Sequence, residues 1–196
     1  MFRKFASGLV NFLLKLVYPI EIYGQDNIPE GRVLVLANHG HLLDPFLVNM
    51  AYKKHFFVIG KTELFEIPIL KYILYAVDAF PVDRDQLDLR AIKTSIAKLK
   101  ESSLLIFPEG TRNGSLIPLE GKSGAVMMAA QAGVDMLPIA LVGNYKLFRS
   151  LKVFILPARS VEEFGYERLN SRAYSGIVNS LLSDIYQKLQ EETNDH

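Results

Sequence analysis

The apolar residues of this chain fall into short runs that alternate with longer amphipathic segments. Runs of four to six mainly apolar residues predict strands at residues 33–37, 56–59, 79–82, 104–107, 136–141 and 152–156. Helical spacing of apolar positions predicts helices at residues 45–52, 68–76, 87–100, 123–132 and 172–190. This alternation predicts a single layered α/β domain over residues 21–196, with a mostly parallel central sheet and helices on its faces.

Residues 1–20 carry a mainly apolar pattern that polar side chains interrupt at helical spacing. On a helical wheel Lys4, Asn11 and Lys15 gather on one side, opposite a wide apolar face that includes Phe12 and Leu16. The interruptions leave too few consecutive apolar residues for a spanning helix, and the absence of a small-residue cleavage pattern disfavours a signal peptide. We expect an amphipathic helix in the membrane interface, which places the protein, peripheral or monotopic, at the cytoplasmic face of the cell membrane. Packing against the protein's own sheet is the alternative.

A second apolar zone covers residues 65–77 and is broken chiefly by Glu66 and Lys71. It has two interpretations. The segment joins the first helix in a membrane-facing side or in a channel for an acyl chain, or it is an ordinary buried helix.

A histidine and a carboxylate stand five positions apart directly after the apolar run at residues 33–37. Neither a helix nor a strand brings His39 and Asp44 onto one face at this spacing, so their contact requires a turn. Gly40 favours that turn, Asp44 is suited to a helix N-cap and Pro45 to the first helical position. A carboxylate-held imidazole is a general base for deprotonating an alcohol. Taken alone, Asp44 could equally be a simple cap and His39 a loop histidine.

A loop that carries charge and glycine follows the run at residues 104–107. Glu109 and Arg112 stand in it beside Gly110, at the carboxyl end of a predicted strand, where ligands bind in open α/β sheets. Read alone, Asn113-Gly114 is a turn signal and Glu109 with Arg112 a surface ion pair.

Five segments, in this order and spacing, resemble the glycerolipid acyltransferases, specifically the 1-acylglycerol-3-phosphate (lysophosphatidic acid) acyltransferase family. They are NHGHLLD at 38–44, GKTELF at 60–65, FPVDR at 80–84, FPEGTR at 107–112 and LPI at 137–139. The resemblance runs from Asn38 to Ile139, more than half of the chain. An NH-x4-D pattern followed by FPEGTR is a specific combination.

The resemblance implies an acyl transfer and a role for each matching residue in it. His39 would take the proton from the acceptor hydroxyl, and Asp44 would orient the ring and stabilise the imidazolium. The other matching residues would bind the acceptor: Lys61, Arg84, Glu109, Gly110, Thr111 and Arg112. The cations among them would hold its phosphate, since a guanidinium can bond two phosphate oxygens and a lysine supplies a point charge. Without the resemblance, Lys61 is a solvated residue at a strand end and Arg84 pairs with a neighbouring aspartate.

One residue departs from the family pattern. The family often has a small hydroxyl residue two positions after the histidine, whereas this chain has His41. Its imidazole could line the acceptor pocket, compete for Asp44 or point into solvent, and we expect it to line the pocket.

The implied reaction moves a fatty acyl group from a thioester to lysophosphatidic acid and forms phosphatidic acid in phospholipid biosynthesis. Acyl-coenzyme A and acyl carrier protein both fit as donors. A thioester is already activated, so no metal and no cofactor are expected. The alternatives are another lysolipid acceptor, such as a lyso-ornithine lipid, and a non-catalytic lipid-binding module. Hydrolysis by a serine nucleophile is disfavoured because the chain has no G-x-S-x-G pattern.

The composition excludes or disfavours several other classes of function. The chain has no cysteine, which excludes a cysteine nucleophile, a thiolate metal site and disulfides. Its four histidines form no HExxH pattern, so zinc hydrolysis has little support. A net charge of +1 and the lack of a nucleic-acid-binding motif argue against a nucleic-acid partner.

Overall fold

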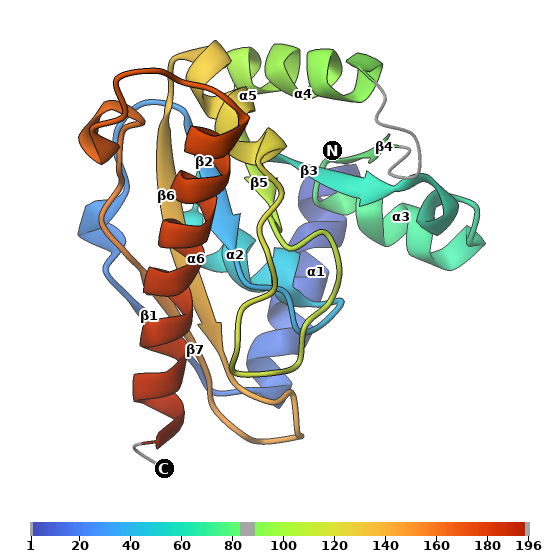
Figure 1. Cartoon of the computed structure of the whole chain (residues 1–196). Coiled ribbons are helices and arrows are strands. Elements are labelled where there is room, and N and C mark those ends of the chain that lie inside the picture. The colour runs from blue at the N-terminus through green and yellow to red at the C-terminus, as the bar shows by residue number, and fades with distance from the viewer. Residues whose placement is uncertain (1, 83–88, 195–196) are drawn as a thin grey trace.

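Seven strands join into one sheet in the order β1-β7-β6-β2-β5-β3-β4 (Figure 1). They are β1 (Ile20–Tyr23), β2 (Val33–Ala37), β3 (Phe56–Lys61), β4 (Ala79–Val82), β5 (Ser103–Ile106), β6 (Asp135–Val142) and β7 (Leu151–Ile155). Neighbouring strands are parallel, except that β6 and β7 are antiparallel. The computed structural model describes residues 2–82 and 89–194. The expected α/β domain with a mostly parallel sheet is confirmed.

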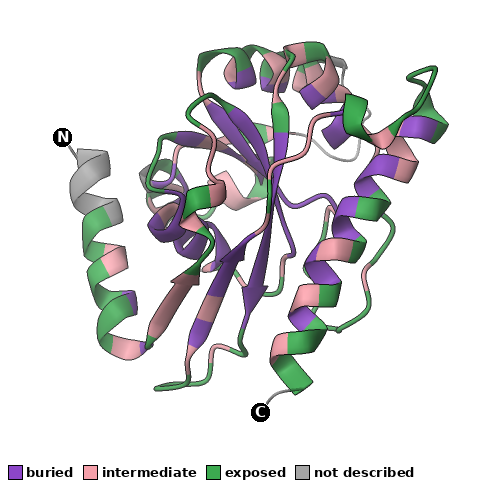
Figure 2. Cartoon of the chain, turned by 90° about the vertical axis from the view of Figure 1, so that its left-hand side faces the viewer, coloured by how far each residue is buried: buried purple, intermediate pink, exposed green. Residues whose placement is uncertain are grey.

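Helices cover both faces of this sheet. One face carries α1 (Phe2–Val17), α2 (Asp44–Tyr52) and α3 (Pro68–Ala76), and the other carries α4 (Leu89–Glu101), α5 (Gly124–Ala132) and α6 (Ser171–Asn194). Short 3-10 helices lie at Gln25–Asn27, Thr62–Phe65 and Glu162–Phe164. Figure 2 shows α1 and α6 on opposite sides of the buried strands.

Strand β2 shows why these layers form. All five of its residues are buried, and they alternate between the two apolar cores. Val33 and Val35 pack toward the α1–α3 side, and Leu34 and Leu36 toward the α4–α6 side. A strand that is apolar on both faces has to lie between two layers of helices, as parallel sheets do.

The predicted elements match the observed ones to within a few residues, with one omission. Strand β1 was not predicted: it has only four residues, includes Glu21, and lies at the sheet edge, where it pairs with β7 alone. The helix expected at residues 87–100 is α4, and its first two expected residues, 87 and 88, lie outside the described part of the chain.

Helix α1 has apolar side chains on two sides. Leu14, together with Tyr18 directly after the helix, is buried in the core, whereas Phe12 and Leu16 are 64% and 68% exposed. The two interpretations of this segment therefore apply to different sides of one helix. In the part of the chain that the structure covers, no helix has both the length and the apolar content needed to cross a membrane.

Helix α3 lies beside α1 (Figure 1). Its outer side is also apolar. Leu74 is buried, but Ile69 is 78% exposed and Tyr72 54% exposed. Residues 65–77 therefore do not form an ordinary buried helix.

The segments after β2, β5 and β6 meet at one edge of the sheet. These three strands are mutually parallel neighbours in the order β6-β2-β5, so their carboxyl ends point the same way. Residues 38–44, 107–114 and 143–150 extend from those ends. This edge is where an open α/β sheet presents its binding residues.

Candidate active site

The turn at residues 38–44 is fixed to the sheet by Asn38. Its side-chain amide donates to the Leu141 carbonyl at 2.9 Å and accepts from the Leu141 N–H at 2.7 Å. Asn38 is buried, so both of these bonds lie away from water. They tie the end of β2 to β6 and set the starting position of the turn.

His39 and Asp44 are in direct contact. His39 Nδ1 lies 2.8 Å from Asp44 Oδ2, and the Asp44 side chain is 2% exposed. The same oxygen accepts hydrogen bonds from the backbone N–H groups of Gly40 and His41, each at 2.8 Å. One carboxylate oxygen therefore closes the turn and holds the imidazole.

The helix after this turn begins one residue earlier than expected. Helix α2 starts at Asp44 itself and its N-cap is Leu43, so Asp44 as the N-cap is wrong. Its carboxylate points back to the turn, toward the N–H groups of Gly40 and His41, and not toward the first N–H groups of the helix. Pro45 still lies in the first helical turn, where its missing N–H costs nothing.

These contacts set the tautomer of His39. Since Asp44 Oδ2 already accepts two N–H groups, His39 Nδ1 is the donor in their shared hydrogen bond. In the neutral ring this leaves Nε2 with a free lone pair. The ring stacks on Phe107, with centroids 4.0 Å apart and planes inclined by 18°, which fixes its orientation. His39 is therefore arranged to accept a proton at Nε2.

Tyr145 is a residue of this site that the sequence motifs did not indicate. It comes from the loop after β6, and its hydroxyl donates to Asp44 Oδ1, the oxygen that His39 does not use. Burial and the nearby Asp44 carboxylate raise the pKa of Tyr145 far above the usual value, so the hydroxyl stays protonated and acts as a donor. Both oxygens of Asp44 are thus held in place.

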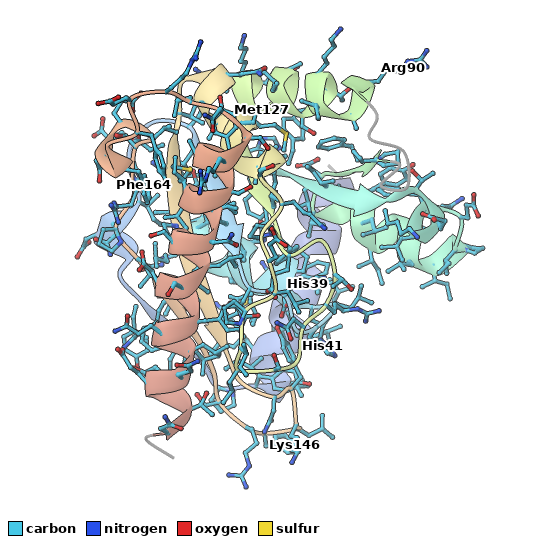
Figure 3. All side chains as sticks on the ribbon, in the orientation of Figure 1. His39, His41, Arg90, Met127, Lys146 and Phe164 are labelled. Carbon is cyan, nitrogen blue, oxygen red and sulfur yellow. The ribbon has the colours of Figure 1, made fainter. Side chains whose placement is uncertain are left out.

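His41 stacks on the Tyr145 ring, with centroids 4.0 Å apart. Its Nδ1 accepts a hydrogen bond from the Leu43 N–H at 3.3 Å, and it reaches Asp44 through its backbone only. The side chain of His41 therefore does not compete with His39 for the carboxylate. Figure 3 shows both histidines beside the loop that follows β5. A pocket-lining role for His41 stays a prediction.

Glu109 anchors the loop after β5 from within. It is 3% exposed, and its Oε1 accepts from the Tyr186 hydroxyl of α6 at 2.7 Å. Its Oε2 accepts from Asn113 Nδ2 at 2.7 Å and from the Leu119 N–H at 3.0 Å. With three donors inside the protein, this carboxylate supports the loop, so we expect any effect on the acceptor to be indirect.

Removing the Tyr186 hydroxyl should destabilise the protein. In Tyr186→Phe one buried oxygen of Glu109 loses its donor, which is expected to lower the free energy of unfolding by about 1–3 kcal/mol. Urea unfolding measures the change. Tyr72→Phe is the matched control, because this tyrosine is 54% exposed. Equal stability of the two variants would contradict the anchoring role of Glu109.

The same loop contacts the histidine turn. Asn113 N donates to the His39 carbonyl at 2.6 Å, so Arg112 is adjacent to a residue bonded to His39. Gly110 has φ +71°, a left-handed conformation that glycine adopts without strain. Thr111 and Arg112 are exposed, which leaves both accessible to a ligand.

The structure does not place the other two predicted cations, Lys61 and Arg84, beside the His39 turn. Lys61 ends β3, two strands from β2 along the same sheet edge, and its ammonium pairs with Glu63 at 2.8 Å. Arg84 lies outside the described residues. The structure therefore brings together His39, Asp44 and the loop that carries Arg112.

A cavity of about 650 Å³ opens beside the buried acid. Asp44, Tyr145 and Gly40 are among the residues that line it, and Lys146 and Arg149 line it from the loop between β6 and β7. Small-molecule sites usually measure about 300–1,000 Å³. The volume is therefore sufficient for part of a lipid or of an acyl carrier.

Known acyltransferases are similar to this chain in sequence. A family model described as acyltransferase matches residues 19–142. The 1-acyl-sn-glycerol-3-phosphate acyltransferase of Bacillus subtilis is 28% identical over 96% of this chain and 98% of its own length. The enzyme of the same name from Streptococcus pneumoniae is 31% identical over 98% of this chain and 75% of its own length.

A solved structure shares the fold. The crystal structure of the 1-acyl-sn-glycerophosphate (LPA) acyltransferase PlsC from Thermotoga maritima superposes with a TM-score of 0.71. The match covers 96% of this chain and 78% of the other, at 22% sequence identity.

Proposed function

This chain belongs to the 1-acyl-sn-glycerol-3-phosphate acyltransferase family, and we propose that it transfers a fatty acyl group from a thioester to the free hydroxyl of 1-acylglycerol-3-phosphate. The product is phosphatidic acid. The observation that carries the proposal is the His39–Asp44 pair, whose geometry leaves Nε2 available as a base beside the Arg112 loop. The choice of 1-acylglycerol-3-phosphate as the acceptor is based on the names of the relatives.

The proposed reaction proceeds by general base catalysis. His39 Nε2 takes the proton of the acceptor hydroxyl as its oxygen attacks the thioester carbonyl carbon. Asp44 stabilises the imidazolium that forms, and Tyr145 and the turn N–H groups hold Asp44 in place. Collapse of the tetrahedral intermediate breaks the carbon–sulfur bond. The imidazolium then returns its proton to the departing thiolate, which leaves an ester, a free thiol and neutral His39.

Arg112 is proposed to hold the phosphate of the acceptor. It is exposed on the loop whose next residue, Asn113, bonds to the His39 carbonyl. A guanidinium matches a phosphate with two parallel hydrogen bonds, so Arg112 can fix the acceptor while its hydroxyl approaches His39. Lys61, which now pairs with Glu63, would have to exchange that partner for phosphate.

Arg112→Ala should raise the KM for the acceptor by about 10- to 100-fold, because charge-assisted bonds to phosphate contribute about 1.5–3 kcal/mol. The kcat should change less, since this contact is present before and during the reaction. Steady-state rates over a range of acceptor concentrations separate the two parameters. Arg168→Ala, at another exposed arginine, is the control. An unchanged KM would remove Arg112 from the phosphate site.

An acceptor and donor panel tests the proposed function. Purified protein is incubated with lysophosphatidic acid, lysophospholipids of larger head group and a lyso-ornithine lipid, each with acyl-coenzyme A or acyl carrier protein as donor. We expect lysophosphatidic acid to be the preferred acceptor. Preference for another lysolipid would change the assigned substrate. Binding without turnover in any combination would indicate a non-catalytic lipid-binding module.

We also propose that α1 attaches the protein to the cytoplasmic face of the cell membrane. Its outer side exposes Leu9, Phe12, Leu13 and Leu16, while Leu14 holds the helix to the core. Helix α3 continues this apolar surface with Ile69 and Tyr72. A helix fixed in this way can lie flat in the lipid interface without leaving the domain.

A further inference from the structure

The loop between β6 and β7 places two large apolar side chains in solvent. Leu147 is 67% exposed and Phe148 is 75% exposed. Single exposed apolar residues are common on protein surfaces, but these two are adjacent and stand between two exposed cations, Lys146 and Arg149. Figure 3 places Lys146 at the end of the molecule beyond His41.

The fold gains little from the Phe148 ring. Phe148 has φ +62°, a conformation that strains bulky residues and that glycine or asparagine adopts more easily. Its ring is mainly in solvent, so burial does not offset that strain. The loop is nevertheless ordered by hydrogen bonds: Arg149 N donates to the Lys146 carbonyl at 3.0 Å, and the Tyr18 hydroxyl donates to the Tyr145 carbonyl at 3.1 Å.

The loop continues the exposed side of α1. Phe148 N donates to the Val17 carbonyl at 3.2 Å, at the point where α1 ends. Leu16, in the last turn of that helix, is 68% exposed, and Lys15 beside it is exposed as well. The apolar side of α1, the Leu147–Phe148 pair and the cations around them therefore belong to adjoining parts of one surface.

We propose that Lys146-Leu147-Phe148-Arg149 is a second membrane contact, in which Leu147 and Phe148 enter the interface of an anionic bilayer and the flanking cations bind lipid phosphates. Apolar side chains between cations match the composition of an anionic lipid surface. This proposal rests on the proposed function for its substrate, because a lysolipid acceptor resides in that bilayer.

The contact would also explain how the acceptor reaches the site. Lys146 and Arg149 line the cavity that extends to Asp44 and Tyr145. With the loop in the interface, the cavity opens at the level of the lipid phosphates, so an acceptor enters without crossing water. The residue that precedes the contact, Tyr145, bonds to Asp44, which links the membrane-binding loop directly to the acid of the site.

Vesicle sedimentation of the full chain tests the proposal. The vesicles contain phosphatidylcholine with or without phosphatidylglycerol, and the variant is Leu147→Ser/Phe148→Asn, in which asparagine tolerates the positive φ. We expect binding to anionic vesicles to fall by about tenfold or more, since two apolar anchors are removed. The control, Leu169→Ser, changes an apolar residue of 43% exposure near the start of α6, whereas the cavity is lined from the other end of that helix. It should bind as wild type does.

Activity toward a detergent-dispersed acceptor provides the second measurement. The double variant should keep wild-type rates there, which shows that it is folded, and should lose activity only when the acceptor is in vesicles. Unchanged vesicle binding would overturn the proposal. So would a selective loss with acyl carrier protein as donor, which would make the loop a contact for an acidic protein. If wild type binds vesicles through the loop but transfers no acyl group, the proposed function fails and this inference stands.

Discussion

Replacing His39 with alanine should lower kcat by about 10²- to 10⁴-fold, the usual contribution of a positioned general base. The substitution removes Nε2, the atom that takes the acceptor's proton. The fold should persist, because His39 lies in a turn at the sheet edge and its side chain is 18% exposed. Steady-state kinetics with thioester and acceptor, together with thermal unfolding, measure both effects.

His41→Ala is the matched control for this experiment. It removes an imidazole two residues away whose ring stacks on Tyr145 and makes no bond to the Asp44 carboxylate. We expect a much smaller fall in kcat than in His39→Ala. If the two variants were impaired in the reverse order, the base would have to be reassigned to His41.

Asp44→Asn should be about as damaging, with a fall in kcat of up to about 10⁴-fold, as when the acid of a Ser-His-Asp triad is replaced by its amide. The amide oxygen can still accept the N–H groups of Gly40 and His41, so the turn is expected to survive. However, the neutral side chain no longer stabilises an imidazolium at His39. With the amide oxygen in the place of Oδ2, His39 Nδ1 donates to a neutral acceptor, which is a weaker bond than the one to a carboxylate.

Tyr145→Phe separates position from charge in the same network. It removes one hydrogen bond to Asp44 Oδ1 and leaves the three N–H contacts to Oδ2 intact. We expect a smaller fall in kcat than in Asp44→Asn and little change in the acceptor's KM. If Asp44→Asn retained most of the wild-type kcat while folded, the carboxylate would serve only to close the turn at residues 39–44.

The centre of the site could be predicted because its determinants are local. His39 and Asp44 are five residues apart, and Gly40 and Pro45 restrict the turn that joins them. The same reasoning placed the strand before the turn, because an unbroken apolar run is typical of a buried parallel strand. The one-residue error at Asp44 arose because its carboxylate bonds backward to the turn and not forward to the helix.

The supporting contacts could not be predicted because they join residues far apart in the chain. Tyr145 reaches Asp44 across 101 positions, and Tyr186 reaches Glu109 across 77. The first contact depends on the position of β6 within the sheet, and the second on how α6 packs against the sheet. No local sequence pattern determines either. The family resemblance assigns Glu109 to the acceptor-binding residues, but it does not indicate that the buried carboxylate is enclosed by donors of the protein itself.

For α1, a helical wheel does not show which apolar side chains face the core and which are exposed. The polar positions define one side, but they do not show how the wide apolar remainder divides between core and surroundings. In the structure Leu14 faces the core, and Phe12 and Leu16 do not. The membrane and packing interpretations were treated as alternatives, whereas the helix has surface for both.

The protonation pattern of the His39 ring is the sharpest test of its role as the general base. Nitrogen-15 chemical shifts of the labelled imidazole, recorded where the ring is neutral, distinguish the two tautomers. We predict a protonated Nδ1 bonded to Asp44 and an unprotonated Nε2, with this preference weakened in Asp44→Asn. A proton found on Nε2 of the neutral wild-type ring would contradict this prediction, because that nitrogen could then take no proton from the acceptor.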